Sequence, residues 1–404
     1  MNDNATLPHR VVPILADTGT AYGRPEPTYK KELTEVGAGT PMGELLRRYW
    51  HPVGLAADAT DTPRKVRVLG EDLILFRDKT GRPGLVYPNC AHRGSSLYYG
   101  RVEERGIRCC YHGWLFDVQG HCVEQPCEPE SGAKSCGKVR QPWYPVQEQY
   151  GMVWAYMGPP EKKPVLPRYE CLETFEDGEF LEADDSSVGG GGPEIIPCNW
   201  LQHYENLVDP FHVVILHSSF SGTQFVEQMA LMPEVKWETA ELSVRTISRR
   251  KLPDGKTLHR ISEAGLPTLR VIPNPLVKRH GMVEMLGWVL PIDDHSFRIY
   301  NVARVQEKGE IKRMRSTRNG KYWEELTEAE RRTYPGDYEA QVSQGDIAKH
   351  SEEFLAMSDM GIVMLRRLLQ KQLKAVSEGK DPAGVSFDPE APPVKFSAGN
   401  FLMD

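Results

Sequence analysis

The stretch CAHRGSSLYYGRVEERGIRCCYHGW, residues 90–114, decides the fold of the first part of this chain. It contains two metal-ligand motifs, Cys90-x-His92 and Cys109-x-x-His112, with sixteen residues between His92 and Cys109. Each motif offers one thiolate and one imidazole, whereas a zinc finger normally groups cysteine with cysteine and histidine with histidine. Mixed pairs suit a [2Fe–2S] cluster in which two histidines replace two cysteines on one iron. A structural Cys2His2 zinc site and coincidence are the alternatives.

The residues around these ligands support the same interpretation. Gly94 and Gly113 each follow a ligand closely, and glycine there allows the backbone to close on the cluster and direct N–H groups at sulfur. Only Cys109 gives the C-x-x-H spacing with His112, so we expect Cys110 to be a packing residue. Cys122, Cys127 and Cys136 have no histidine at a useful spacing, and we expect buried or free thiols there.

The composition is that of a globular protein and excludes several classes of partner. A length of 404 residues exceeds the size at which single cores usually stop growing, which predicts two domains. The net charge of -7 gives no support for nucleic-acid or anionic-membrane binding. No run approaches the ~20 apolar residues that span a bilayer, and the first residues show no signal peptide. We therefore expect a cytoplasmic protein with reduced cysteines.

The character of the sequence changes along the chain. Short strand-like segments fill residues 64–158, and a proline-rich stretch over 159–170 is typical of an interdomain linker. Residues 205–217 and 337–377 show helical patterns, and Pro253-Asp254-Gly255 marks an antiparallel hairpin. The sequence predicts an α+β fold in three parts: an arm with a short helix (1–45), an all-β domain with the cluster (46–160) and a domain with an antiparallel sheet flanked by helices (161–404).

A second group of metal ligands lies in NWLQHYENLVDPFHVVILHSSF, residues 199–220. Two histidines, His212 and His217, with a carboxylate such as Asp209 are typical of O₂-activating Fe(II) sites that keep coordination positions open. Asp209 and His212 share a helix face because they are three residues apart. On an ideal helix His217 points about 140° away from His212. Both can reach one metal only if the helix ends or bulges between them.

The chain resembles the Rieske non-haem iron ring-hydroxylating oxygenases, and most closely the oxygenase (α) subunits of the phthalate-dioxygenase type. The resemblance rests on the motif spacing, on HRG and YHGW around the two histidines, and on GTPMGELLRRYWHPVG and VRVLGEDLILFRD. It covers most of the first 130 residues and the iron segments, whereas 218–340 matches less. It implies a Rieske [2Fe–2S] domain followed by a catalytic domain of helix-grip, START-like fold that holds mononuclear Fe(II).

The resemblance also implies roles for individual residues. Cys90, His92, Cys109 and His112 would bind the cluster. His212 and His217 would bind the iron. Asp209 would connect His212 to a cluster-ligating histidine as an electron-transfer bridge, since a carboxylate on the second nitrogen of a metal-bound histidine fixes its tautomer and couples the sites. Asn206 would lie near the iron.

The carboxylate ligand must then come from elsewhere, and we expect Asp359 in EEFLAMSDMGIVMLRRLL to supply it. If this segment is helical, Leu355, Ile362 and Val363 place Asp359 in an apolar stripe, where an unpartnered carboxylate is costly. The family also places its last ligand on a late helix. A helix N-cap role or an ion pair with Arg366 is the alternative. The rival carboxylates are Asp346, Glu352 and Glu353.

Two kinds of protein partner are expected, an electron donor and further copies of this chain. No G-x-G-x-x-G follows a strand, so electrons must arrive from a separate NAD(P)H-dependent reductase. The resemblance implies a homotrimer, or a hexamer of stacked trimers, in which the cluster of one subunit serves the iron of its neighbour.

The resemblance makes a small aromatic, carboxylated compound and O₂ the expected substrates, without choosing between hydroxylation and oxidative demethylation. Arg245 and Arg249 could clamp the carboxylate, or could form a solvated strand face. A non-catalytic Rieske electron carrier and a zinc-stabilised binding protein are the other hypotheses. The ~240 residues beyond the cluster domain, with their second His/His/Asp set, argue against a carrier.

Overall fold

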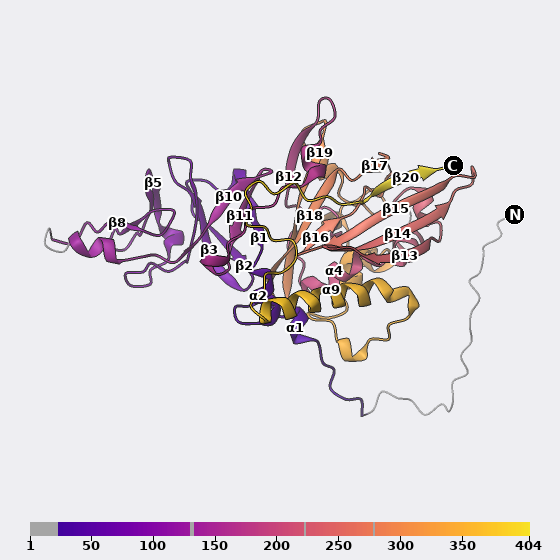
Figure 1. Cartoon of the computed structure of the whole chain (residues 1–404), viewed down its shortest axis with the longest axis horizontal. Helices are drawn as coiled ribbons and strands as arrows, with labels where there is room; N and C mark the ends of the chain where they lie inside the picture. Colours follow the sequence, from indigo (N-terminus) through magenta and orange to yellow (C-terminus); the bar gives the residue numbers. More distant parts are fainter. Residues whose placement is uncertain (1–22, 130–132, 222–223, 278) are drawn as a thin grey trace.

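A computed structural model of the chain describes residues 23–129, 133–221, 224–277 and 279–404. Three small antiparallel sheets form one end of the molecule, and a nine-stranded antiparallel sheet forms the other, which confirms the predicted α+β class (Figure 1). The small sheets have the orders β1-β11-β10, β2-β3-β4-β9 and β5-β6-β7-β8. Their strands are β1 (Trp50–Leu55), β2 (Arg64–Val68), β3 (Glu71–Arg77), β4 (Pro83–Val86), β5 (Arg101–Glu103), β6 (Gly106–Arg108), β7 (Leu115–Phe116), β8 (Cys122–Glu124), β9 (Trp143–Tyr144), β10 (Val146–Gln149) and β11 (Met152–Tyr156).

The large sheet has the order β12-β19-β18-β16-β15-β14-β13, with β20 pairing both β15 and β17. Its strands are β12 (Phe180–Asp184), β13 (Glu234–Thr239), β14 (Ser243–Lys251), β15 (Thr257–Gly265), β16 (Leu269–Val271), β17 (Gly281–Met282), β18 (Met285–Asp293), β19 (Ser296–Val305) and β20 (Gly399–Met403). The predicted hairpin is confirmed, because β14 and β15 pair through a turn that Gly255 allows with φ +87°.

Most helices are short, and only one is long. The α-helices are α1 (Lys31–Thr34), α2 (Pro41–Leu46), α3 (Glu170–Glu173), α4 (Trp200–Asn206), α5 (Phe211–Val214), α6 (Glu310–Arg313), α7 (Glu328–Thr333), α8 (Asp337–Val342) and α9 (Met360–Ser377). The short 3₁₀ turns are η1 (Ala56–Asp58), η2 (Leu97–Tyr99), η3 (Ala133–Lys138), η4 (Pro160–Lys162), η6 (Glu227–Ala230), η7 (Trp323–Glu325), η8 (His350–Glu352) and η9 (Met357–Asp359). None of the helices within the described ranges is both long and apolar enough to cross a bilayer.

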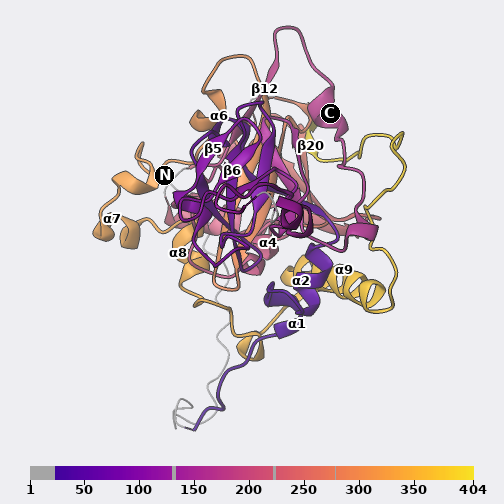
Figure 2. The same cartoon turned by 90° about the vertical axis from the view of Figure 1, so that its left-hand side faces the viewer.

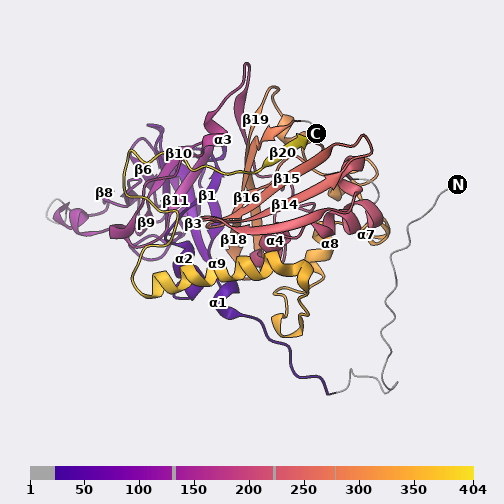
Figure 3. The same ribbon diagram turned by 45° about the vertical axis from the view of Figure 1, so that its right-hand side comes forward.

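The helical stretch expected over 337–377 is two helices, α8 and α9, rather than one. Gly345, with φ +95°, follows α8, and a segment with only single turns connects it to α9. Helix α9 packs across the large sheet at β13 and β14 (Figure 3). Gly361 permits this approach, because a Cβ there would lie 2.5 Å from the Trp237 indole nitrogen.

One hydrophobic core joins two of the small sheets, those of β1 and β2, to the large one, whereas β5–β8 pack in a second core with Cys90 and Cys109. Trp154 of β11 meets Trp288 of β18 edge to face, with ring centroids 5.0 Å apart, and Tyr169 packs on the same indole at 5.6 Å. The Gly70 N–H donates to Ile292 O at 2.8 Å, which adds a backbone contact between the two ends. The proline-rich stretch over 159–170 lies within this contact rather than hanging free, since Pro164 O accepts from the Trp50 indole at 2.9 Å.

A buried ion cluster fixes α9 to α4. The Arg366 guanidinium, on α9, contacts carboxylates of Glu205 and Glu353, each at 2.8 Å from Nη2. Replacing Arg366 by methionine leaves both carboxylates without their partner. We expect a loss of about 2–3 kcal/mol of unfolding free energy, below the ~3–5 kcal/mol of full burial because the Glu353 side chain is 25% exposed. Urea unfolding followed by circular dichroism measures the loss, with the exposed Arg367→Met as the matched control.

Candidate metal centres

The two motifs around residues 90 and 109 form loops of the same geometry. The Gly94 N–H donates to Cys90 O at 2.8 Å, and the Gly113 N–H donates to Cys109 O at 3.1 Å. Both glycines are left-handed, with φ +76° and +73°, which a residue with a side chain rarely adopts. Both cysteines are only 3% exposed, and burial together with the Cys109 thiol raises the pKa of Cys90 to about 11. Facing buried thiols of this kind suit metal ligation.

The histidines of the two loops are half-buried, whereas the two cysteines are buried. The rings of His92 and His112 are 4.6 Å apart, and His92 stacks on Trp114 at 4.3 Å. The buried His92 Nδ1 has no hydrogen-bond partner among the described residues. Two inner thiols and two outer imidazoles have the chemistry of a [2Fe–2S] cluster with an accessible histidine edge. The structure therefore brings together the four residues predicted from the sequence.

The remaining cysteines of this end do not join the group. Cys110 is exposed rather than packed, so that expectation was wrong. Cys122 is buried and its Sγ lies 3.0 Å from Sγ of Cys136, and both are free thiols.

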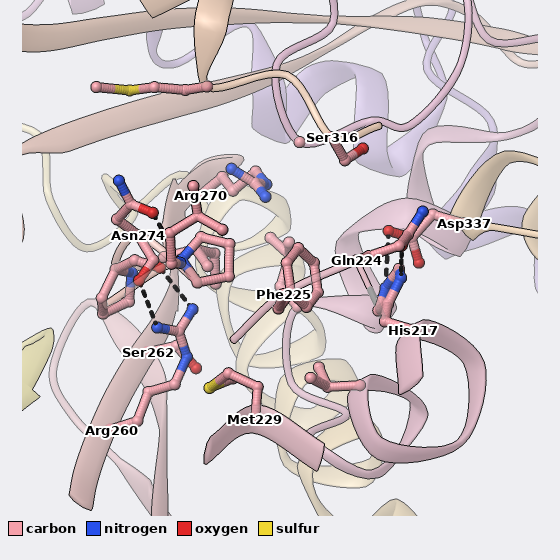
Figure 4. Close-up of a pocket in the computed structure, with 18 of the residues that line it drawn as sticks. His217, Gln224, Phe225, Met229, Arg260, Ser262, Arg270, Asn274, Ser316 and Asp337 are labelled. Carbon is pink, nitrogen blue, oxygen red and sulfur yellow. Dashed lines mark hydrogen bonds and ion pairs between the residues drawn. The ribbon is translucent and has the colours of Figure 1, made fainter. Parts of the chain in front are cut away.

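A second group of metal ligands consists of His212, His217 and Asp337, which each place one ligand atom within 4.8 Å of the others. Figure 4 shows two of them, His217 and Asp337, side by side at the wall of a cavity. The Asp337 carboxylate is 3.3 Å from His217 Nε2 and 3.7 Å from His212 Nε2. Two imidazoles and one carboxylate converging on one point form the donor set of a non-haem Fe(II) site.

A π-helix reconciles the spacing of the two histidines. After α5 the chain continues as η5 (Ile215–Phe220), in which the Ser221 N–H donates to Leu216 O, five residues back, at 2.7 Å. A wide turn of this kind brings residues five apart onto one face, so the His212 and His217 rings lie 5.2 Å apart. The bulge that the sequence required is therefore present.

The carboxylate of this group is Asp337, and the expectation of Asp359 was wrong. Asp359 directly precedes α9, and its carboxylate accepts the Ala356 N–H at 2.7 Å. The apolar stripe is absent because the helix begins only at Met360, and Leu355 is 41% exposed. Asp337 stands instead in the first turn of α8, behind Pro335-Gly336. The rival carboxylates are engaged elsewhere or exposed: Asp346, Glu352 and Glu353.

Electrostatics around the group favour a bound cation. Burial disfavours the charged form of Asp337, yet the His217 and His212 imidazoles hold the pKa of this carboxyl well below its ordinary value. Burial also opposes protonation of His212, but Asp209 and Asp337 raise the pKa of His212. A metal ion between the imidazoles would supply the positive charge that the carboxylates require.

Polar side chains surround the three ligand residues. His212 Nδ1 is 3.6 Å from the Asp209 carboxylate, beyond hydrogen-bond length, and this buried atom has no hydrogen-bond partner among the described residues. Gln224 Oε1 contacts His217 Nδ1, and Asn206 Nδ2 lies 3.4 Å from Asp337. A neighbour on the second ring nitrogen fixes which nitrogen is free for metal. Asn206 was predicted to lie near the iron, whereas nothing in the sequence singled out Gln224.

A cavity of about 250 Å³ opens beside the ligand group. In Figure 4, Phe225 and Met229 lie between His217 and a polar far wall that carries Arg260, Arg270 and other hydrogen-bonding groups. Its volume is below the ~300–1,000 Å³ typical of ligand pockets, which suits a compound of one or two rings.

Neither Arg245 nor Arg249 lines the cavity, so the clamp alternative does not hold for either of them. Arg245 points away from the cavity and lies 3.4 Å from the Glu263 carboxylate, and Arg249 is exposed. The cavity is lined instead by their even-numbered neighbours Ser248 and Arg250. Successive side chains of a strand point to opposite faces, so Arg250, next to Arg249, is an arginine of β14 that faces the cavity.

Comparison with known proteins decides the family. The Rieske [2Fe-2S] domain matches residues 49–145. The phenoxybenzoate dioxygenase subunit alpha of Ectopseudomonas oleovorans is 49% identical over 402 residues, which are 97% of this chain and 97% of that one. This chain belongs to the Rieske oxygenases.

Two further comparisons place this Rieske oxygenase within the family. The phthalate 4,5-dioxygenase oxygenase subunit of Pseudomonas putida is 30% identical over 87% of each chain, which confirms the phthalate-dioxygenase type. Among solved structures, Pseudomonas putida CBB5 NdmA (QL mutant with caffeine) superposes with a TM-score of 0.61 at 17% identity, covering 87% of this chain and 99% of that one. The chain is the oxygenase component of such a system and thus an oxidoreductase.

Proposed function

We propose that this oxygenase hydroxylates a small aromatic carboxylic acid at a mononuclear Fe(II) held by His212, His217 and Asp337. The convergence of these three side chains on one point beside a ring-sized cavity carries the proposal. The iron, when bound, activates O₂ beside the substrate. Electrons come from an NAD(P)H-dependent reductase through the [2Fe–2S] cluster on Cys90, His92, Cys109 and His112. We expect this system in the cytoplasm, where thiols stay reduced.

The residues present fit both metal groups. The Asp337 carboxylate lies 3.7 Å from His212 Nε2 and 3.3 Å from His217 Nε2, and one ligand atom of each residue lies within 4.8 Å of the others. His217 is 4% exposed on its side chain and Asp337 is 14% exposed, so the polar atoms sit at the wall of the cavity rather than in bulk water. Phe225 packs on the His217 ring at 4.9 Å and limits water on that side.

The position of the cluster supports transfer between subunits. The loops that hold His92 and His112 lie beside β5–β8, at the end of the molecule that is remote from the large sheet and its cavity (Figures 1 and 2). Asp209 and His212 also line a second depression, which includes Leu216 and Ile362. A neighbouring chain in a ring of three could present its cluster histidine there, which makes a homotrimer or stacked trimers the proposed assembly.

A loading experiment tests the function. Protein reconstituted anaerobically with iron and sulfide is combined with a Rieske-system reductase, NADH and a panel of aromatic acids. We expect O₂ consumption coupled to a hydroxylated product, and loss of turnover in His217→Ala with the cluster spectrum intact. A demethylated product would assign the alternative chemistry. Bound zinc without an iron–sulfur chromophore, or full turnover after His212→Ala/His217→Ala, would refute the proposal.

The bridge role of Asp209 gives a separate prediction. Asp209→Asn keeps a hydrogen-bonding side chain but removes the charge beside His212 Nδ1. We expect both metal groups to load normally, while cluster reoxidation in single-turnover stopped flow slows by about 10–100-fold. Asp346→Asn is the matched control, because Asp346 is an exposed carboxylate on another segment. Unchanged reoxidation in Asp209→Asn would exclude the bridge.

A further inference from the structure

The far wall of the cavity carries three arginines from three neighbouring strands. Arg250 lies on β14, Arg260 on β15 and Arg270 on β16, which are adjacent in the sheet. The pairing registers set Ser248 opposite Arg260, and Ala264 opposite Arg270. With the two-residue period of strands, all three guanidinium groups project from one face of the sheet into the cavity.

None of these three arginines forms an ion pair with any described residue. Arg250 is 1% exposed and donates from Nε to Leu231 O at 3.0 Å, while its buried Nη1 has no partner among the described residues. Arg260, 8% exposed, is held by Asn400 Oδ1 at 2.9 Å and by carbonyls. Arg270 makes no hydrogen bond with the described part of the chain, and its buried Nε is unpartnered.

The backbone at Gly189 packs against the Arg270 side chain. Gly189, with φ +79°, lies against its guanidinium, where a Cβ would stand 2.2 Å from Nη2. The guanidinium therefore cannot retreat toward the loop, and its free donors stay at the cavity wall. Figure 4 shows Arg270 and Arg260 across Phe225 from His217.

The cations outnumber the anions at this wall. Glu284 is the acidic side chain that lines the same end, and Asp337 lies with the imidazoles. Burial, with the charges of Arg250 and Arg270, lowers the pKa of Arg260 to about 9, and the charge of Glu284 opposes this shift. Charged groups buried without a counter-ion are costly to folding and are normally kept where they bind something.

We propose that Arg270, with Arg250 and Arg260 beside it, forms an anion subsite that takes the carboxylate of the substrate. This inference rests on the proposed function and adds the residues and the pose. A planar guanidinium with free donors matches a carboxylate geometrically and in charge. With the carboxylate at this wall, the ring lies against Phe225 and Met229, and its remote edge faces His217. Oxygenation therefore occurs at ring positions away from the carboxylate.

Equilibrium dialysis on the holoprotein tests the subsite without turnover. The probes are 3-phenoxybenzoate and the matched 3-phenoxybenzamide. We expect the native protein to bind the acid at least about tenfold more tightly than the amide. Arg270→Met should reduce this preference to less than about threefold, and Arg270→Lys should restore part of it. Arg249→Met, from the opposite face of β14, is the matched control and should retain the full preference.

The outcomes separate this inference from the proposed function. Equal binding of acid and amide by the native protein, or an unchanged preference in Arg270→Met, overturns the subsite even if the acid is turned over. If the native protein prefers the acid but shows no iron-dependent turnover, the proposed function is wrong and the proposed anion subsite is still supported. If Arg270→Met does not fold, Arg250→Met, with the same readout, decides.

Discussion

Replacing Asp337 by alanine should remove the mononuclear iron and lower turnover by at least ~100-fold, more than losses at residues that only orient a ligand. The physical reason is that Asp337 supplies the one carboxylate within reach of both His Nε2 atoms in the described chain. Iron content should fall from about three to about two atoms per chain, because the cluster keeps its own pair. Iron analysis and the visible spectrum measure the two groups separately.

Asp359→Ala is the decisive comparison for this prediction. Its carboxylate only accepts the Ala356 N–H, so we expect full iron content and full turnover. Iron loss in Asp359→Ala together with full loading of Asp337→Ala would reverse the assignment. Asp337→Glu adds a stricter check, because it keeps the charge but displaces the oxygen atoms.

Two inactive variants should restore activity to each other when mixed. Cys90→Ser destroys the cluster and keeps the iron site, whereas Asp337→Ala does the reverse. If the cluster of one subunit serves the iron of its neighbour, a mixed ring contains complete pairs. With random equal mixing in a closed ring of three, half of all iron sites are intact. Half of these have a neighbouring subunit with an intact cluster, so turnover should be about one quarter of the native value.

The mixing experiment needs subunit exchange and a control for it. The variants are combined in mild denaturant, reassembled and compared with each variant treated alone. Activity that stays at the level of the single variants, in trimers shown to be mixed by co-purification of an untagged variant with a tagged one, would mean that the electrons stay within one chain. A monomeric mass for the native protein would exclude the ring itself.

The parts of these sites that could be predicted from sequence are the parts built by neighbouring residues. Cys90 and His92 share one loop, as do Cys109 and His112, so their spacing alone identifies the cluster. His212 and His217 are also local, and their five-residue offset even required the wide turn that η5 provides. In these cases covalent connection does most of the positioning.

The failures involve residues positioned by tertiary structure. Asp337 reaches the histidines because α8 packs there, and only the Pro335-Gly336 helix start ahead of it marked the segment. The difference between Arg249 and Arg250 depends on which face of β14 is turned inward. A single sequence cannot fix that parity in a strand whose two faces both carry polar and apolar residues.

The contact between Trp154 and Trp288 has a consequence for electron delivery. A cluster on a tethered head can swing between donor and acceptor, but here the head shares its interior packing with the catalytic half. Swinging would require breaking that packing. In the proposed ring, the spacing between the redox centres would be set when the subunits assemble, and each electron would cross a fixed gap.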